Sequence, residues 1–362
     1  MWITSSLTTA RKPARIALGN FDGVHLGHQR VIEPVLLHKG GLPDESIQLA
    51  ASVTQCLSQP VVASGYSDRI SPWHGDWQAQ VQKGMAPPPI STLDEYATVV
   101  TFFPHPREYF SGQSRPLLTP LEEKTLQLSY IGVDQLMLLP FSKALSQLSA
   151  EAFVEQILIR GLQARQISVG SDFHFGKGRS GNAELLSVIA TQHNVPVTIV
   201  PLQLDECDRI SSSRIRQALS EGRLTEATRL LGRPYTLTGR VVQGQQLGRQ
   251  IGFPTANLKL PSDKFIPRHG VYSVQVCGPC IDASGLMKPG VMNIGNRPTV
   301  AGQDVTVEVH LFDWSDDLYG KTLTVSLDTF LRPEKKFDSL DSLKAQIEAD
   351  CQAARRELKV KG

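Results

Sequence analysis

The sequence predicts an α/β protein, in which a doubly wound parallel-sheet domain is followed by a smaller all-β domain and a terminal helix. The chain has 362 residues, a usual length for about two domains. Apolar strand-like runs alternate with amphipathic helical runs up to about residue 230, and short strands broken by glycine and proline follow from Thr236. Hydrophobic residues make up 41% and charged residues 20%, so the chain can bury a core.

Five apolar runs are expected to be buried strands of the sheet. They are RIALGNFDG (15–23), YATVVTFFPHP (96–106), VDQLMLLPF (133–141), ARQISVGSDF (164–173) and VPVTIVPL (195–202). Helical patterns occur at 28–40, where Val31, Val35 and Leu36 share a face, and at 150–162 and 182–194. This alternation favours a parallel sheet covered by helices. The letters MWITSSLTTARKPA are expected to precede the first strand.

Residues 41–95 interrupt this pattern. The stretch is rich in Gly, Ser, Pro and Gln and has little periodicity, so we expect a long surface insertion that is mobile in part. The first domain, over 1–230, therefore carries an insertion.

The second domain, over 231–362, is expected to be a β barrel or sandwich. Its strand-like runs are TLTGRVV (236–242), GVYSVQV (270–276), TVEVHLF (306–312) and LTVSLDTF (323–330). A final helix at 339–358 places Leu340, Leu343, Ile347 and Cys351 on one stripe. This stripe predicts one packed face.

Charge and composition exclude several classes of function. Lys and Arg number 37 and Asp and Glu 35, a net charge of +2 that gives no general argument for nucleic acid or anionic membrane as a partner. No stretch has the apolar length of a transmembrane helix, so we expect a cytoplasmic protein without a membrane partner. The five scattered cysteines are a poor basis for a disulfide framework, and CGPC (277–280) follows a strand, which favours a plain turn over a redox or zinc motif. We make no prediction of the oligomeric state.

The stretch GNFDGVHLGH (19–28) favours a phosphate site. Its glycines allow close approach of backbone to a ligand, and a helix beginning near His28 directs N–H groups and a positive dipole toward an anion. His25 and His28 can both face that anion and donate hydrogen bonds as charge grows on a pentacoordinate phosphorus. Two surface histidines beside a turn would produce the same sequence pattern.

A second cluster, DRISSSRIRQAL (208–219), places three serines and two arginines at an expected helix start. Ser211 to Ser213 can cap the helix and bind phosphate, and Arg214 adds a bidentate donor. A capped helix with solvated arginines is the common alternative. Two such helix starts in one α/β domain would form the walls of a nucleotide crevice at the carboxyl edge of the sheet.

The third candidate site is GRQIGFPTANL (248–258), between two expected strands. In an extended chain the oxygens of Thr255 and Asn257 fall on one side, a reasonable geometry for two neutral ligands of a hydrated Mg²⁺ that also contacts ATP. Glu308 alternates with Val307 and Val309, so its carboxylate points away from an apolar pair, toward solvent or a pocket. A Pro-Thr-Ala-Asn run is more often a turn, and most strand glutamates face water.

The front motifs resemble a known family. GNFDGVHLGH resembles the HxGH signature of nucleotidylyltransferases, and ISSSRIR (210–216) is similar to the ISSTxIR signature of bacterial FMN adenylyltransferases. TFFPHPREYF (101–110) and VGSDFHFGKGRSG (169–181) resemble two further blocks of that branch. Ser213 stands where the family more often has Thr, and the 41–95 insertion is a larger departure.

The resemblance implies roles for residues of these motifs. His25 and His28 would stabilise the ATP phosphates in the transition state. The other residues that would bind ATP are Gly19, Phe21, Asp22, Gly23, Ser212, Ser213 and Arg214. Pro104, His105 and Asp172 would lie along the flavin.

The rest of the chain, from GRQIGFPTANL through GVYSV, VMNIGNRPT, VEVHLFD and LRPEKKFDSLDSLKAQI, resembles the riboflavin kinase module. The resemblance implies a β barrel in which Thr255 and Asn257 hold Mg·ATP and Gly252 lies near the phosphates. Glu308 would be the general base that takes the proton from the ribityl 5′-hydroxyl.

Together the two halves are similar to the bacterial bifunctional riboflavin kinases/FAD synthetases. The family implies phosphorylation of riboflavin to FMN and adenylylation of FMN to FAD, with Mg²⁺, ATP, riboflavin, FMN and FAD as its small-molecule partners. Two alternatives stay open: a kinase whose adenylyltransferase domain is impaired by the insertion, and a non-catalytic flavin-binding regulatory protein. An adenylyltransferase for another acceptor is a third, which the TANL stretch disfavours.

Overall fold

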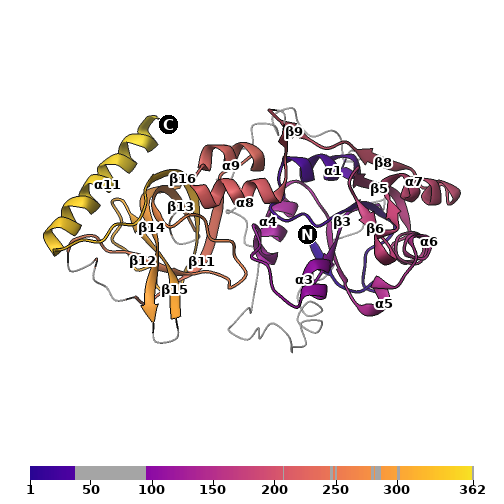
Figure 1. The fold of residues 1–362 in the computed structure, drawn as a ribbon, viewed down its shortest axis with the longest axis horizontal. Helices are drawn as coiled ribbons and strands as arrows, with labels where there is room; N and C mark the ends of the chain where they lie inside the picture. Colours follow the sequence, from indigo (N-terminus) through magenta and orange to yellow (C-terminus); the bar gives the residue numbers. More distant parts are fainter. Residues whose placement is uncertain are drawn as a thin grey trace. The chain divides into compact units, whose positions relative to one another are not determined.

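A computed structural model describes residues 1–36, 95–206, 208–244, 248, 251–278, 281, 287–299 and 302–360 (Figure 1). The expected insertion at 41–95 lies outside the described residues except for its last one. The described chain falls into two compact units, one with residues 1–36, 95–115 and 121–210 and the other with 116–120 and 211–360. A functional boundary near residue 230 stays a prediction. No described helix is both long and apolar enough to cross a membrane.

The first unit is built on a six-stranded parallel sheet, as expected. Its strands are β1 (Trp2–Thr4), β2 (Ala14–Leu18), β3 (Tyr96–Phe103), β4 (Gln135–Pro140), β5 (Ala164–Gly170) and β8 (Val197–Val200), in the spatial order β1-β4-β3-β2-β5-β8. The five expected strands are confirmed. The expectation that the N-terminal letters precede the first strand is wrong, because Trp2–Thr4 pairs with Gln135–Met137 at the edge of the sheet. Two small antiparallel pairs, β6 (His174–Phe175) with β7 (Gly181–Asn182) and β9 (Leu204–Asp205) with β10 (Asp208–Arg209), complete the strands.

Helices cover both faces of this sheet. The face that includes Ala17 packs against α1 (Leu26–Leu36) and α4 (Leu121–Tyr130). The face that includes Ile16 and Leu18 packs against α6 (Ala150–Phe153), the π-helix η3 (Val154–Gly161) and α7 (Ala183–Gln192). Alternate residues of β2 thus enter two separate cores, as a doubly wound sheet requires. Three shorter elements, α3 (Pro106–Ser111), α5 (Lys143–Ser146) and the 3₁₀ turn η4 (Lys177–Arg179), complete the helices of the unit.

The strand order has a switch point at β2. From β2 the chain passes to β3 and β4 on one side and later returns to β5 on the other. The loops after β2 and β5 therefore diverge at the carboxyl edge, the position at which open α/β sheets bind ligands.

The second unit contains a closed antiparallel barrel. Its strands are β11 (Thr236–Val242), β12 (Ala256–Lys259), β13 (Gly270–Cys277), β14 (Lys288–Thr299), β15 (Gly302–Leu311) and β16 (Thr322–Arg332), in the order β11-β12-β15-β14-β13-β16. The structure thus selects a barrel over a sandwich. It also makes strands of Ala256–Lys259 and Lys288–Thr299, which the alternation pattern did not assign.

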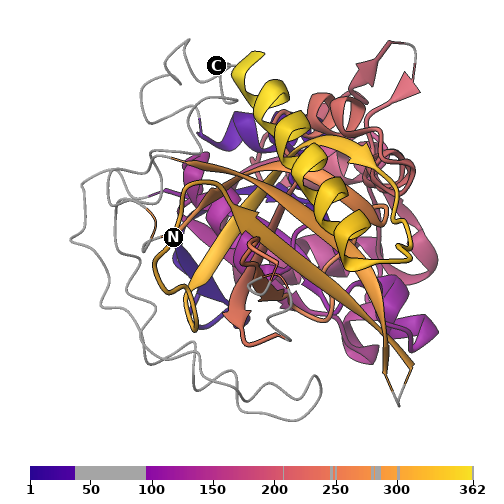
Figure 2. The same ribbon diagram turned by 90° about the vertical axis from the view of Figure 1, so that its left-hand side faces the viewer.

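The described residues of the second unit include the helices α8 (Ser212–Glu221), α9 (Leu224–Leu231) and α11 (Leu340–Val360). Figure 2 shows α11 lying across the barrel strands. Cys351 and Ala354 pack on Val271 and Val291, but Leu340 is 66% exposed, so the packed stripe begins later than expected. The bidentate bonds of Arg332 to Asp350 hold the helix at this point.

A short segment from the middle of the chain completes the second unit. The peptide N–H of Leu117 donates to Asp263 O (2.6 Å), and Leu117 O accepts from the N–H of Phe265 (2.8 Å). The buried ammonium of Lys264 donates to Leu118 O at 2.8 Å. Residues 116–120 therefore form a strap on the loop before β13.

Candidate active sites

His25 and His28 lie together where α1 begins. The ring centroids are 3.6 Å apart and the planes nearly parallel, at 15°. His25 is buried, and its Nδ1 accepts the peptide N–H of His28 at 3.2 Å, which satisfies one of the free donors of the first helical turn. Because Nδ1 accepts, Nε2 carries the proton of the neutral His25 ring. This hydrogen bond and the ring stacking thus hold both imidazoles at the N-terminus of α1.

The loop before α1 has a backbone that is far from regular. Phe21, Gly23 and Val24 all have positive φ (50°, 91° and 43°), which is costly for a β-branched residue such as Val24. A Cβ on Gly27 would lie 3.2 Å from the His25 ring, so this glycine gives the imidazole its room. The Phe21 side chain is buried and packs on the His28 ring, which leaves its backbone as the part that faces the loop.

Pro104 and His105 lie after β3, at the same edge of the sheet. His105 caps α3: its Nδ1 accepts the N–H of Arg107 (3.0 Å), and the Glu108 carboxylate accepts the N–H of His105 (3.2 Å). Burial lowers the pKa of His105, which keeps the imidazole neutral as this acceptor role requires. Contact with flavin stays a prediction for both residues.

Asp172 lies in the loop after β5. Its carboxylate accepts a hydrogen bond from Arg209 of β10, and both side chains are nearly half exposed. The pair joins the loop after β5 to the β9–β10 hairpin, and contact of Asp172 with flavin stays a prediction.

Ser212, Ser213 and Arg214 form the first turn of α8, as the cap pattern predicts. Ser211 precedes the helix, and its Oγ accepts the N–H of Arg214 at 3.3 Å. The Arg214 Nε donates to Glu226 of α9 at 2.9 Å, and both side chains are largely buried.

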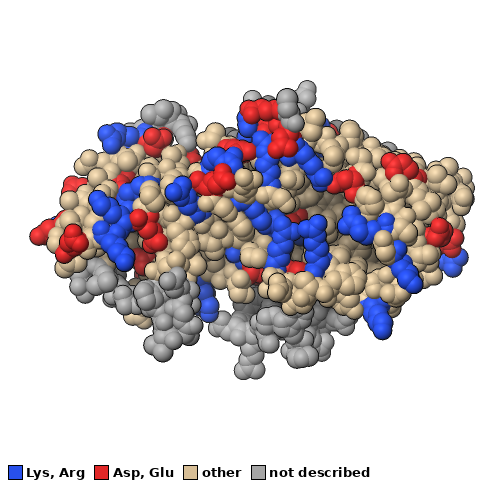
Figure 3. All heavy atoms as spheres, in the orientation of Figure 1, with Lys and Arg blue, Asp and Glu red and all other residues tan. Residues whose placement is uncertain are grey.

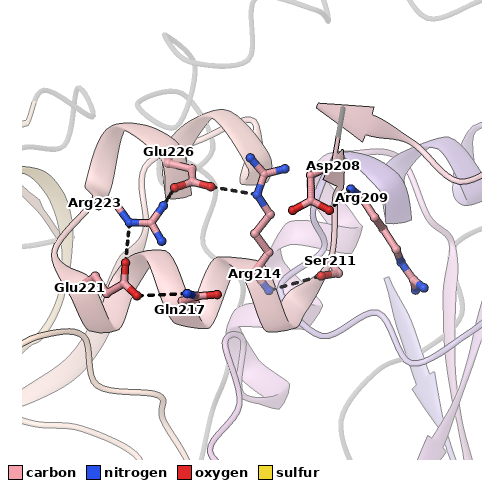
Figure 4. Close-up of polar contacts among 8 residues, drawn as sticks. All are labelled: Asp208, Arg209, Ser211, Arg214, Gln217, Glu221, Arg223 and Glu226. Atoms are coloured by element: carbon pink, nitrogen blue, oxygen red, sulfur yellow. Dashed lines mark hydrogen bonds and ion pairs between the residues drawn. The ribbon is translucent and has the colours of Figure 1, made fainter. Parts of the chain in front are cut away.

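Figure 4 shows that the same contacts continue through Arg223 and Glu221 to Gln217. In Figure 3 acidic and basic side chains accordingly lie side by side over α9. This network fixes the direction of Arg214. Joint binding of one ATP by the histidines and α8 stays a prediction.

The barrel brings Thr255, Asn257 and Glu308 together. Asn257 of β12 is directly opposite Glu308 of β15, and Glu308 is also opposite Asn293 of β14. The Thr255 hydroxyl donates to Glu308 Oε2 at 3.4 Å. All four side chains are half-buried, whereas Val307 and Val309 point into the barrel. The alternation that predicted a carboxylate opposite an apolar pair is confirmed.

Close packing holds this polar row in place. A Cβ on Gly244 would overlap the Asn257 amide, with Cγ at 2.6 Å and Oδ1 at 2.8 Å. His310 Nδ1 donates to Pro254 O at 2.8 Å and so fixes the peptide that precedes Thr255. Gly252 lies nearby in the chain, exposed and with φ at +90°.

Sequence patterns did not single out Asn293, Gly244 or His310. Only the strand register reveals Asn293, since β14 was not expected. His310 alternates with Glu308 along β15, and this spacing could have indicated it.

The donor set of the row fits Mg²⁺. A hydroxyl, an amide oxygen and a carboxylate are the hard oxygen ligands that this ion prefers. Gly244, which has no Cβ, leaves Asn257 the space to take part. Among the described residues, no group of three or more His, Cys, Asp or Glu side chains could hold a metal ion.

The cysteine motif has no redox geometry in its described part. Cys277 ends β13, buried, and burial raises its pKa to about 11, so the thiolate is scarce near neutral pH. Cys280 lies outside the described residues.

Comparisons with known proteins match both units. A family model described as FAD synthetase matches residues 7–41 and 90–214, and one described as riboflavin kinase matches 231–358. The first match omits 42–89, within the expected insertion.

Similar proteins match over nearly the whole chain. Bifunctional riboflavin kinase/FMN adenylyltransferases of Pseudomonas fluorescens, Escherichia coli K12 and Bacillus subtilis are 37%, 36% and 32% identical, over 93%, 94% and 94% of this chain and 91% of each relative. A crystal structure described as a macrolide-efflux protein from Streptococcus pneumoniae has a TM-score of 0.72 and 28% identity, and covers 98% of both chains. With its parallel-sheet unit, its closed barrel and this similarity over more than nine-tenths of its length, the chain belongs to the family of bifunctional riboflavin kinases/FMN adenylyltransferases.

Proposed function

We propose that the chain is a bifunctional enzyme that phosphorylates riboflavin to FMN and then adenylylates FMN to FAD, with ATP as the second substrate of both steps. The strongest support is the row Asn257–Glu308–Asn293 with the Thr255 hydroxyl on the Glu308 carboxylate. A strand carboxylate among neutral oxygen donors is the arrangement that hydroxyl phosphorylation needs.

In the kinase step, Glu308 is the general base. It takes the proton of the ribityl 5′-hydroxyl while that oxygen attacks the γ-phosphorus, and ADP leaves as the bond to the γ-phosphoryl group breaks. Thr255 donates a hydrogen bond to Glu308 and thereby orients the carboxylate. Thr255 and Asn257 would hold Mg²⁺, which supplies charge neutralisation at the ATP phosphates when it is bound. Gly252 contributes backbone near the phosphates.

In the adenylyl step, a phosphate oxygen of FMN attacks the α-phosphorus of ATP and pyrophosphate leaves. His25 and His28 donate hydrogen bonds to the oxygens that gain charge, helped by the N-terminus of α1. Gly19, Phe21, Asp22 and Gly23 supply the loop backbone, and Ser212, Ser213 and Arg214 hold the triphosphate. No covalent intermediate with the enzyme is required, because positioning and charge stabilisation supply the catalysis.

Aromatic rings beside Pro104 and His105 support a flavin site in the first unit. Phe110 is 71% exposed, and its ring packs edge-on against Tyr109 and Phe141, at 5.4 and 5.7 Å between centroids. Exposed ring faces at the carboxyl edge suit a flat apolar ligand such as isoalloxazine. Asp172 would lie on the same side.

Within this proposal, residues 1–230 perform adenylyl transfer and 231–362 perform phosphorylation. A cytoplasmic location belongs to the same proposal, because both steps consume ATP. No nucleic acid or membrane partner is required by either reaction.

Chromatography of the products of riboflavin and Mg·ATP tests the proposal. We expect wild type to yield FMN and FAD, Glu308→Ala to make no FMN yet convert supplied FMN to FAD, and His28→Ala to stop at FMN. Equal loss of both steps in either variant, each step assayed with its own flavin substrate, would contradict the division of labour. Wild type that makes only FMN would identify the kinase-only alternative, and wild type that turns over no ATP would identify a flavin-binding protein.

A further inference from the structure

Lys124 is a buried cation beneath the loop that precedes α1. It lies on α4 and is only 8% exposed, although lysine is seldom buried without a specific partner. Its ammonium donates to the carbonyl oxygen of Asn20 at 3.2 Å. The hydroxyl of Thr101, at the end of β3, donates to the same oxygen at 3.1 Å. One carbonyl oxygen of the loop thus accepts hydrogen bonds from two different elements, α4 and β3.

This double contact sets the direction of the next peptide N–H. The Asn20–Phe21 bond is not among the described cis bonds, so its C=O and N–H point in opposite directions. With the carbonyl held toward α4 and β3, the N–H of Phe21 points to the other side of the loop. Phe21 has φ of +50°, and such a conformation persists only where surrounding contacts enforce it.

We propose that Lys124 is a positioning residue for adenylyl transfer. It holds the Asn20 carbonyl away from the phosphates of a nucleoside triphosphate, so that the loop presents N–H groups to them. This inference rests on the proposed function of the first unit. The ammonium also places a positive charge behind the loop in a poorly solvated position, where screening by water and salt is weak.

A purely structural role makes a different prediction. Replacing a whole buried ion pair by apolar groups is often neutral or stabilising, whereas removing one charge of a pair costs about 3–5 kcal/mol of stability. Lys124→Met keeps an unbranched side chain, one atom shorter, and removes the donor, so a lysine needed only for packing would be replaced with little loss of activity. Removal of a positioning lysine would lower the rate of adenylyl transfer while the chain stays folded.

The test uses the full chain with two variants, Lys124→Met and Lys124→Arg. We expect Lys124→Met to lower kcat/KM for conversion of FMN to FAD by about tenfold to a hundredfold, mainly through kcat, as for misplacement of groups by about 1 Å. The loss of rate should persist at an assay temperature at which both proteins are fully folded, as their Tm values show. Lys124→Arg, which keeps the charge and a donor, should recover much of the rate. Phosphorylation of riboflavin by the same chain should be unchanged.

The inference is overturned by wild-type adenylylation in Lys124→Met, or by a Lys124→Arg variant that folds yet is as impaired as Lys124→Met. Should Lys124→Met not fold, Thr101→Val decides, because it removes the second donor to the Asn20 carbonyl without burying or freeing a charge. A lower kcat in Thr101→Val at wild-type Tm supports the inference, and an unchanged kcat refutes it. A wild-type chain that forms no FAD from FMN and Mg·ATP would instead refute the proposed function.

Discussion

The kinase site should be sensitive to one methyl group at Gly244. The Cβ of an alanine at position 244 would lie 2.6 Å from Cγ and 2.8 Å from Oδ1 of Asn257, and still closer to the amide nitrogen. Ordinary carbon contacts need about 3.5 Å, so Gly244→Ala must displace the Asn257 side chain by about 1 Å. The backbone φ at Gly244 is not in the positive range, so alanine is tolerated by the chain itself.

A displacement of this size has a predictable cost. Misplacing a group in a phosphoryl-transfer site by about 1 Å costs about a hundredfold in rate, or roughly 2.7 kcal/mol of transition-state stabilisation. We expect kcat/KM for riboflavin phosphorylation to fall by about this factor in Gly244→Ala. Conversion of supplied FMN to FAD by the same chain is the internal control, and it should not change.

A double-mutant cycle with Asn257→Ala tests the cause. If the added methyl acts through the Asn257 side chain, Gly244→Ala should have little further effect once that side chain is absent. Full kinase activity in Gly244→Ala would refute the geometry of the row. An effect that simply adds to that of Asn257→Ala would refute the role given to the amide.

Three further outcomes are expected. Leu118→Ala, in the strap, removes a fully buried side chain and should destabilise the second unit by about 2–5 kcal/mol. Loss of kinase activity with increasing urea measures this. A lower urea midpoint for adenylyl transfer alone would contradict the assignment of residues 116–120 to the second unit. His310→Phe removes the donor to Pro254 O and should lower riboflavin phosphorylation about tenfold, measured against unchanged FMN adenylylation. Burial raises the pKa values of Cys277 and Cys351 to about 11, so with the other three cysteines exchanged for serine a thiol reagent at pH 7.5 should react slowly with the folded chain, faster near pH 10, and promptly in urea.

Local pattern was sufficient for most of the architecture. Five strands of the parallel sheet were predicted because buried strands contain mostly apolar runs, and Leu136–Leu139 of β4 is one example. The start of α8 was predicted because Ser211 has a side chain that caps helices. For Glu308, the alternation with two valines was enough to predict the face on which the carboxylate lies.

Contacts between residues far apart in the sequence could not be predicted from local sequence patterns. Strand β1 has three residues and pairs with a strand more than a hundred residues away, so neither length nor periodicity indicates it. The segment 116–120 lies between elements of the first unit in sequence and belongs to the second by its hydrogen bonds. Lys124 follows two glutamates on a helix, the usual pattern of a solvated face, and only the fold shows that it is buried.

The two candidate sites share one structural feature, a loop carbonyl that accepts a side-chain hydrogen bond, although the folds of the two units are unrelated. In the first unit, Lys124 and Thr101 hold the Asn20 carbonyl; in the second, His310 holds the Pro254 carbonyl. In each case a side chain from a neighbouring element donates a hydrogen bond to the C=O of a peptide. Because the peptide bond is trans, the N–H of the following residue, Phe21 or Thr255, points in the opposite direction. A loop expected to contact ATP gains by this arrangement, because exposed carbonyls repel phosphate and N–H groups attract it. Since each holding side chain belongs to the same unit as its loop, removing either donor should impair one reaction and spare the other, and a chain that carries both changes should lose the two activities independently.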